Sequence, residues 1–152
     1  MKIIVIQCLD VFCAPDFNHL SRCHRRFILR PMTRAIVNAH AATLPGATHS
    51  DPWGGGHDAW KVGGKLFAVV GAMEDHGVAV KCADIETAQL LIEMARALPA
   101  PYFHKSWVRI PWGQVDAAEL RERITKSYLT IRAGLPKKVQ AALGNRIIQP
   151  LP

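Results

Sequence analysis

The chain has 152 residues, of which 49% are hydrophobic and 20% are charged, and its formal net charge is +7. This composition is typical of one globular domain with a sizeable core, and no run approaches the roughly 18–20 apolar residues of a membrane-spanning helix. Mild basicity permits a nucleic-acid or other anionic partner without indicating one. None of the four cysteines forms a C-x-x-C pair or a zinc-finger spacing, so we expect free thiols in a reducing cytoplasm, no metal and no cofactor.

Residues 1–31 differ from the rest, with five Lys or Arg against two Asp and neither a strand nor a helix period. The run Ile3–Phe12 resembles a secretory signal, but Gln7 and Asp10 interrupt it and no small-residue cleavage site follows. We expect a flexible extension, or translated sequence upstream of a start at Met32. The alternative is a nucleic-acid-binding arm built on the arginines of this segment, which are Arg22, Arg25, Arg26 and Arg30.

The domain is predicted to extend over residues 32–144, followed by a frayed tail at 145–152. Thr33 is a candidate N-cap for a first helix that ends before Pro45-Gly46. The next loop, Asp51–Gly56, is rich in glycine but lacks Gly-Lys-Ser/Thr. It is therefore predicted to be a flexible entry into the first strand rather than a phosphate cradle.

The centre of the chain predicts three consecutive antiparallel strands, Trp60–Val62, Lys65–Met73 and Val78–Cys82. Gly63-Gly64 is typical of a two-residue hairpin turn, and a second turn follows at Glu74–Gly77. The middle strand is apolar on both faces, which predicts a place inside the sheet rather than at its edge.

A second helix and two more strands are expected after this meander. Asp84 is the predicted N-cap of the helix, and Pro99 stops it. Two short strands, Tyr102–Lys105 and Trp107–Trp112, are then predicted on either side of a tight turn at Ser106.

Asp116 and Glu119 form a capping box for a third helix, Gly134 is its expected C-terminal cap, and a short helix follows from Pro136 to Leu143. The predicted class is therefore α+β, in the order α-β-β-β-α-β-β-α plus a short C-terminal helix. The side chains expected between sheet and helices are Leu66, Val70, Ile85, Leu91, Val108, Ile110, Leu120, Ile124 and Tyr128.

Several short sequence motifs occur in order between Thr33 and Leu143: Leu44-Pro45-Gly46, Trp60–Ala68, Val78–Cys82, Pro101-Tyr102, His104-Lys105 before Trp107-Val108, Ser127-Tyr128 and Leu135–Lys138. A chain with these motifs in this order resembles the MmcQ/YjbR family of small bacterial proteins. The resemblance implies a two-layer fold, one five-stranded antiparallel sheet with helices on one face, similar to frataxin-like and secretion-chaperone-like folds. It also implies the family's common DNA-binding label, through a "double wing" of hairpins. The first helix contains no Asp or Glu, which argues against a frataxin-like iron role.

A two-layer fold leaves one sheet face uncovered. Strand alternation predicts that Lys65, Phe67 and Val69 share one face, opposite Leu66, Ala68 and Val70. By the same rule Ala79 shares a face with Lys81, and Trp107 shares one with Arg109. We therefore predict a basic and aromatic open face whose binding residues are Lys61, Lys65, Lys81, Lys105, Arg109, Phe67 and Trp107.

Cations beside aromatic platforms suit backbone phosphates and unstacked bases, so the leading hypothesis is a non-enzymatic module that binds DNA without sequence preference. The same face suits a homodimer or protein partner, or a small anionic ligand. A plain solvated face, with lysines protecting the sheet edge, is the structural alternative.

Catalytic candidates exist, but no catalytic motif contains them. Asp51 and Asp58 flank the glycine-rich loop, and a pair in sequence is not yet a pair in space. No nucleophile elbow, zincin motif or phosphate loop is present. The candidate nucleophiles and bases are Cys82, Ser106, Ser127, His49, His57, His76 and His104.

Overall fold

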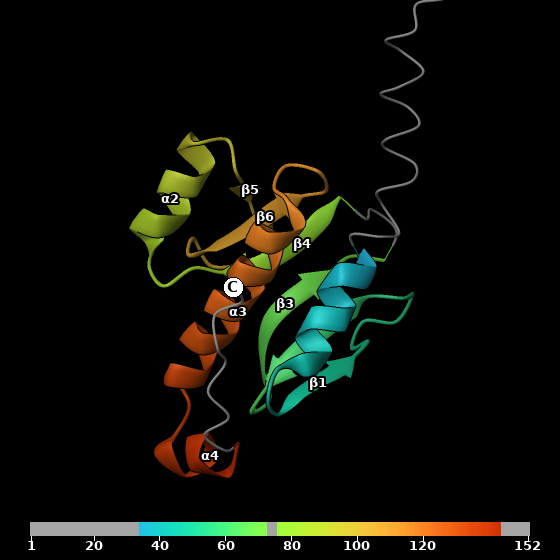
Figure 1. The fold of residues 1–152 in the computed structure, drawn as a ribbon, viewed down its shortest axis with the longest axis vertical. Helices are drawn as coiled ribbons and strands as arrows, with labels where there is room; N and C mark the ends of the chain where they lie inside the picture. The colour runs from blue at the N-terminus through green and yellow to red at the C-terminus, as the bar shows by residue number, and fades with distance from the viewer. Residues whose placement is uncertain (1–33, 73–75, 144–152) are drawn as a thin grey trace, which may run out of the picture.

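The computed structural model describes residues 34–72 and 76–143, so the predictions for residues 1–31 and for the tail at 145–152 lie outside the described residues. Within the described part, a six-stranded antiparallel sheet in the order β1-β2-β3-β4-β6-β5 carries the helices on one face (Figure 1). The strands are β1 (Ala47–Ser50), β2 (Asp58–Val62), β3 (Lys65–Val70), β4 (Gly77–Lys81), β5 (Leu98–Pro99) and β6 (Trp107–Pro111). The helices are the first helix (residues 34–43), α2 (Ile85–Glu93), α3 (Ala117–Ala133) and α4 (Lys137–Ala142).

The predicted meander of three strands is confirmed as β2, β3 and β4. Gly63 and Gly64 form the turn between β2 and β3 with φ angles of 55° and 79°, the left-handed values that a tight hairpin turn requires at both central positions. Strand β3 has a hydrogen-bonded neighbour on each side, as its apolar character on both faces predicted.

A β-bulge changes which side chains of β3 face the helices. Trp60 pairs with Ala68 but Lys61 pairs with Leu66, so Phe67 is an extra residue in β3. A bulge re-aims the side chains that follow it, and here Phe67 and Ala68 both lie in the helix-side core while Leu66 packs on the other face. The predictions that Phe67 faces the open side and that Leu66 belongs to the helix-side core are therefore wrong.

Ser127 of α3 links β3 to β4 just beyond the last pair of their ladder, Ala68 with Val80. Its hydroxyl donates a hydrogen bond to the carbonyl oxygen of Phe67 at 2.5 Å and accepts one from the backbone N–H of Lys81 at 2.8 Å. Ser127 is fully buried, so this hydroxyl supplies the partners of two strand groups where the β3–β4 ladder ends. The residue is structural rather than a nucleophile.

The sheet has six strands rather than the five predicted, and both edges differ from the prediction. Strand β1 was not predicted because Ala47–Ser50 has no alternation of apolar and polar residues, and it pairs with β2 only at the sheet edge. The segment Tyr102–Lys105, predicted as a strand, contains no strand residues. The edge partner of β6 is instead β5, where Pro99 occupies the kind of edge position that tolerates a missing N–H.

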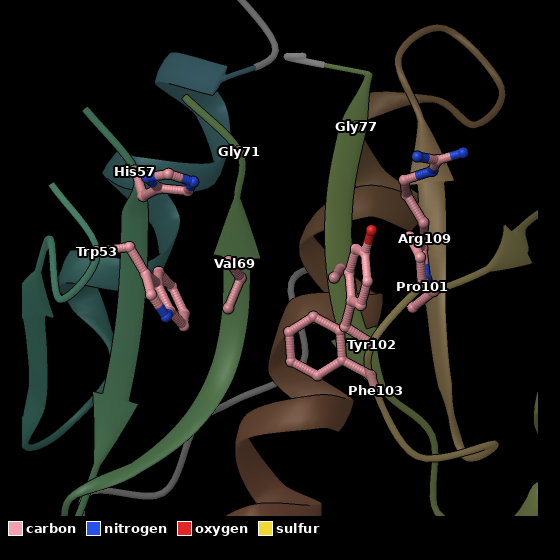
Figure 2. A pocket seen from close by; sticks show the side chains of 11 residues that line it. Trp53, His57, Val69, Gly71, Gly77, Pro101, Tyr102, Phe103 and Arg109 are labelled. Carbon is pink, nitrogen blue, oxygen red and sulfur yellow. The ribbon is translucent and has the colours of Figure 1, made fainter. Parts of the chain in front are cut away.

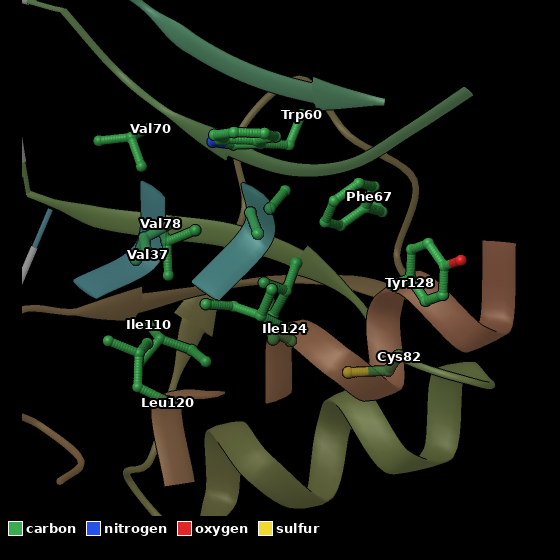
Figure 3. Close-up of a cluster of buried hydrophobic side chains, with 14 of the residues drawn as sticks. Val37, Trp60, Phe67, Val70, Val78, Cys82, Ile110, Leu120, Ile124 and Tyr128 are labelled. Atoms are coloured by element: carbon green, nitrogen blue, oxygen red, sulfur yellow. The ribbon is translucent and has the colours of Figure 1, made fainter. Parts of the chain in front are cut away.

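The helix-side core contains seven of the nine predicted core residues, in addition to Phe67 and Trp60 (Figure 3). Ile85 is the exception on the helices, because it follows the cap Asp84 at the start of α2 and remains 37% exposed. Helix α2 also ends earlier than predicted, and Ala95 beyond its end has a left-handed φ of 53°. The predicted caps of α3 are confirmed, since the Asp116 side chain accepts a hydrogen bond from the Glu119 N–H.

Candidate functional site

A half-open groove of about 590 Å³ lies on the sheet face that the helices leave uncovered (Figure 2). Val69 of β3, Ala79 of β4 and Arg109 of β6 form its floor. Two loops form its walls, the glycine-rich loop on one side and the turn after β5 on the other. The volume falls in the range of about 300–1,000 Å³ that is common for small-molecule sites. We call this site the sheet-face groove.

Aromatic side chains form both rims of the sheet-face groove. Trp53 is 57% exposed on one rim, and Tyr102 on the other is fully exposed to solvent. The backbone of Tyr102 has a φ of 68°, which is rare for a bulky residue and is found preferentially at functional sites. Phe103 beside it stacks on Trp107 at 4.6 Å between ring centroids, so these two rings cover the open face where β6 begins.

Arg109 supplies the only full positive charge among the described lining residues of the groove. Its Nε atom is buried and has no hydrogen-bond partner in the described part of the chain. No ion pair joins Arg109 to a described carboxylate either. A desolvated donor without a partner is costly, and an anionic ligand would supply the missing acceptor.

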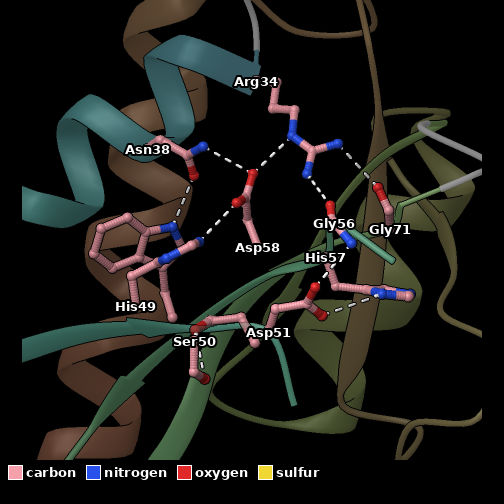
Figure 4. A network of polar contacts seen from close by, with 11 residues as sticks. Arg34, Asn38, His49, Ser50, Asp51, Gly56, His57, Asp58 and Gly71 are labelled. Atoms are coloured by element: carbon pink, nitrogen blue, oxygen red, sulfur yellow. Dashed lines mark hydrogen bonds and ion pairs between the residues drawn. The ribbon is translucent and has the colours of Figure 1, made fainter. Parts of the chain in front are cut away.

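A buried carboxylate holds the glycine-rich wall in place (Figure 4). Asp58 accepts hydrogen bonds from Arg34 Nε at 2.7 Å, Asn38 Nδ2 at 2.8 Å and His49 Nε2 at 2.7 Å. The same Arg34 guanidinium donates to the carbonyl oxygens of Gly56 and Gly71 at 2.5 Å and 3.2 Å. Asp58 therefore fixes the groove wall through Arg34.

The pKa of Asp58 reflects this surrounding network. Burial opposes ionisation of the carboxyl group, but hydrogen bonds from Asn38, Arg34 and His49, together with the charge of Arg34, outweigh it and lower the pKa below its usual range. Asp58 is therefore ionised at neutral pH and paired with Arg34. This excludes Asp58 as a general acid at neutral pH.

His57 is the one imidazole on the groove wall. Its Nδ1 donates to the carbonyl oxygen of Gly54 at 2.8 Å, and its ring meets Trp53 edge-on at 5.4 Å between centroids. Asp51 closes the same loop by accepting from the Gly56 N–H at 2.8 Å. The loop that the sequence predicted to be flexible is thus tied by side-chain hydrogen bonds at both ends.

The predicted binding cations do not share one face. Lys61 pairs with Leu66 and lies on the groove side, and Lys81 lies there too, in register with Trp107. Lys65 pairs with Val62 of the helix-side core, which places it on the opposite face.

Three other predicted binding residues have different surroundings. Lys105 is exposed in the turn before β6. Phe67 is fully buried against the helices and cannot contact a ligand. Trp107 lies on the predicted face, but Phe103 covers its ring.

The candidate nucleophiles are buried. Cys82 lies in the helix-side core, where burial raises the pKa of its thiol above the usual range and makes it unreactive. Ser106 is also buried, and its hydroxyl contacts Lys81 Nζ at 2.7 Å and His104 Nδ1 at 3.0 Å. His49 is engaged by Asp58, and His76 is exposed.

Sequence reasoning missed Trp53, Tyr102 and Phe103, because all three lie in loops where no strand or helix period applies. The signal that could have indicated them is the pairing of aromatic residues with glycine and proline, in Trp53-Gly54 and in Pro101-Tyr102. Binding residues on loops over a rigid scaffold are a common arrangement. Arg34 was also missed, since its role depends on contacts with distant loops.

Neither a metal cluster nor a membrane span is found in the part of the chain that the structure describes. No group of three or more His, Cys, Asp or Glu side chains within residues 34–72 and 76–143 could hold a metal ion. No helix in the same ranges is long and apolar enough to cross a bilayer.

Comparison with known proteins decides the family. A family model described as YjbR matches residues 42–130. The chain belongs to the YjbR family. The sequence resemblance is thereby confirmed, and the matched segment of this YjbR domain includes the whole sheet-face groove.

A solved structure supports the fold of this YjbR domain. The crystal structure of the Deinococcus radiodurans protein DR2400, which carries a DUF419 domain, superposes with a TM-score of 0.63 at 23% sequence identity. The alignment covers 71% of this chain and 85% of that chain. At this identity the likeness concerns the fold alone. No curated protein matches the chain.

Proposed function

We propose that this YjbR domain is a binding module for a small planar molecule that carries an acidic group, and that the ligand occupies the sheet-face groove. The observation that carries the proposal is the buried, unpartnered Nε of Arg109 in an otherwise apolar groove of about 590 Å³. An apolar pocket with one convergent charged group is the usual form of a ligand site, and here that group calls for an anion.

The lining residues support a specific pose. The acidic group of the ligand accepts hydrogen bonds from the Arg109 guanidinium, whose fork geometry matches a carboxylate or phosphate. The planar body lies over the apolar floor between the aromatic rims formed by Trp53 and Tyr102. Tyr102 is well placed to stack on the ligand because its ring packs against nothing in the protein, being fully exposed.

The lining also favours binding over catalysis. Among the described lining residues there is no carboxylate, thiol or serine, and His57 is the one side chain of a type that commonly acts as a general acid or base. His57 uses its Nδ1 to hold Gly54, so it serves the loop rather than a neighbouring nucleophile.

Single-stranded nucleic acid is the second candidate, and the position of Lys61 and the exposure of Lys105 favour it. A base stacked on Tyr102 with its phosphate at Arg109 would use the groove, while the two lysines would contact neighbouring phosphates. In this form the predicted DNA-binding role does not need Lys65 and Phe67, which lie on the helix side.

Calorimetric titration with matched probes tests the proposal. Adenosine 5′-monophosphate and quinoline-4-carboxylate are compared with adenosine and quinoline, which lack the acidic group. We expect the acidic probes to bind at least about tenfold more tightly, because a hydrogen bond to a charged group contributes about 1.5–3 kcal/mol. Arg109→Gln should remove that difference, and Tyr102→Ala should weaken all four probes.

Lys137→Gln in α4 is the matched control, since Lys137 is an exposed cation outside the lining of the groove. Equal binding of acidic and neutral probes, or equal loss in Lys137→Gln and Arg109→Gln, would contradict the proposal. Oligonucleotides separate the second candidate. If affinity rises steeply with strand length and Lys61→Gln with Lys105→Gln abolishes the rise, nucleic acid is the ligand.

A further inference from the structure

A second polar cluster lies outside the sheet-face groove and is centred on the Ser106 hydroxyl. Lys81 Nζ lies 2.7 Å from Ser106 Oγ, and His104 Nδ1 lies 3.0 Å from the same atom. Lys81 Nζ therefore lies within about 6 Å of His104 Nδ1 and within about 8 Å of Nε2 across the imidazole ring, and one tetrahedral anion with two hydrogen bonds of about 2.8 Å spans up to about 8 Å.

The hydrogen bonds fix the direction of each donor. The backbone N–H of Ser106 also donates to His104 Nδ1, at 3.2 Å, so this nitrogen is an acceptor. The Ser106 hydroxyl therefore accepts from Lys81 and donates to His104 Nδ1. In the neutral imidazole the proton then lies on Nε2, and His104 is exposed, so this N–H is available to a ligand.

The charge of the cluster has no counterion among the residues that the structure describes. Lys81 has three donor hydrogens and gives one to a neutral hydroxyl, and no carboxylate within residues 34–72 and 76–143 forms an ion pair with it. Lys81 is half-buried, and the exposed Lys105 lies between His104 and Ser106 in the sequence. A partly desolvated ammonium group without an acidic partner favours an external anion.

The cluster is separate from the groove. Lys81 lies two residues beyond Ala79 on β4, which is about 7 Å along the strand. The stacked rings of Phe103 and Trp107 lie on the same face, and none of Lys81, His104 and Ser106 lines the groove.

We infer that Lys81, His104 and Lys105, with Ser106 as the hub that orients the first two, form a binding site for a tetrahedral oxyanion of the phosphate class. Lys81 Nζ and His104 Nε2 donate to its oxygens, and Lys105 adds charge. The anion is either free phosphate or a second acidic group, a phosphate, on a molecule that also contacts Arg109 in the groove. The second source rests on the proposed function.

Nitrogen-15 NMR titration of the full chain with inorganic phosphate tests the site. We expect saturable shifts of the Lys81 and Ser106 amides and of the His104 ring nitrogens. Lys81→Gln and His104→Ala should each weaken phosphate at least about tenfold, as the loss of a charged or strong hydrogen bond implies. His104 is exposed, so its variant keeps the test valid if Lys81→Gln fails to fold.

Two control variants decide between the possible sources and sites. Lys65→Gln removes an exposed strand lysine on the opposite face and should leave phosphate affinity unchanged. Arg109→Gln should also leave free phosphate unaffected, and it would weaken only a phosphorylated groove ligand. Three results would overturn the inference. The first is loss of phosphate binding in Arg109→Gln, and the second is equal weakening in Lys65→Gln. The third is no localised chemical-shift change at 20 mM phosphate, a concentration of about 10⁻² M that is generous for one weak anion contact.

Discussion

Removing the Ser127 hydroxyl should destabilise the domain far more than removing an ordinary helix hydroxyl. In Ser127→Ala the carbonyl oxygen of Phe67 and the N–H of Lys81 both lose their partner in a fully buried position. Each buried group left unpaired costs about 1–3 kcal/mol, whereas alanine stabilises α3 by about 0.5 kcal/mol because its helix propensity is better than that of serine. We therefore expect the free energy of unfolding to fall by about 1.5–5.5 kcal/mol.

Thr130→Ala on the same helix is the matched control. The Thr130 hydroxyl donates only to the carbonyl oxygen of Lys126, one turn back in α3, at 2.8 Å. Its loss leaves no buried strand group unpaired, and the expected change is within about 0.5 kcal/mol. Urea unfolding followed by circular dichroism measures both variants, provided that the slope against urea is unchanged.

Hydrogen exchange adds a local readout for the same reasoning. The Lys81 amide should lose protection in Ser127→Ala but not in Thr130→Ala, because only the first variant removes its acceptor. If Ser127→Ala matches Thr130→Ala in stability and the Lys81 amide stays protected, the hydroxyl does not bridge β3 and β4, and the account of these two strands is refuted.

Two further predictions concern the groove wall and the sheet. Asp58 has a lowered pKa, so its contribution to stability is present above the unfolded value of about 3.9 and is lost as pH falls through the lower folded value. Asp58→Asn should therefore lower the free energy of unfolding by about 2–3 kcal/mol at pH 7. Measured by acid unfolding, this difference from the parent chain should shrink below about pH 4. A difference that stays constant down to pH 2 would contradict the prediction. Gly77→Ala should prevent folding or cost several kcal/mol more than Gly64→Ala, because a Cβ at Gly77 would lie 2.1 Å from the Ile110 carbonyl oxygen while Gly64, also at positive φ, has nothing within 4 Å. Equal urea midpoints for the two glycine variants would show that the backbone of β6 moves aside.

The β3 bulge shows where sequence reasoning about the site stopped. Alternation is a local rule, and it placed Ala79, Lys81, Trp107 and Arg109 on the correct face. It failed at Phe67, because a bulge depends on how β2 and β3 align and leaves no mark in the alternation of β3 itself. The open face therefore lacks the Lys65 cation and the Phe67 ring that alternation placed there.

The sequence by itself determined the elements whose causes are local. The Gly63-Gly64 turn, the caps at Asp84 and Asp116, and the short helix after Pro136 follow from backbone preferences and from hydrogen bonds within a few residues. The tertiary structure alone decided the edge strands and the sheet-face groove. The groove exists because Arg34, held by Asp58, fixes the glycine-rich loop across the sheet from Tyr102, and contacts between residues so far apart in the chain have no local signal.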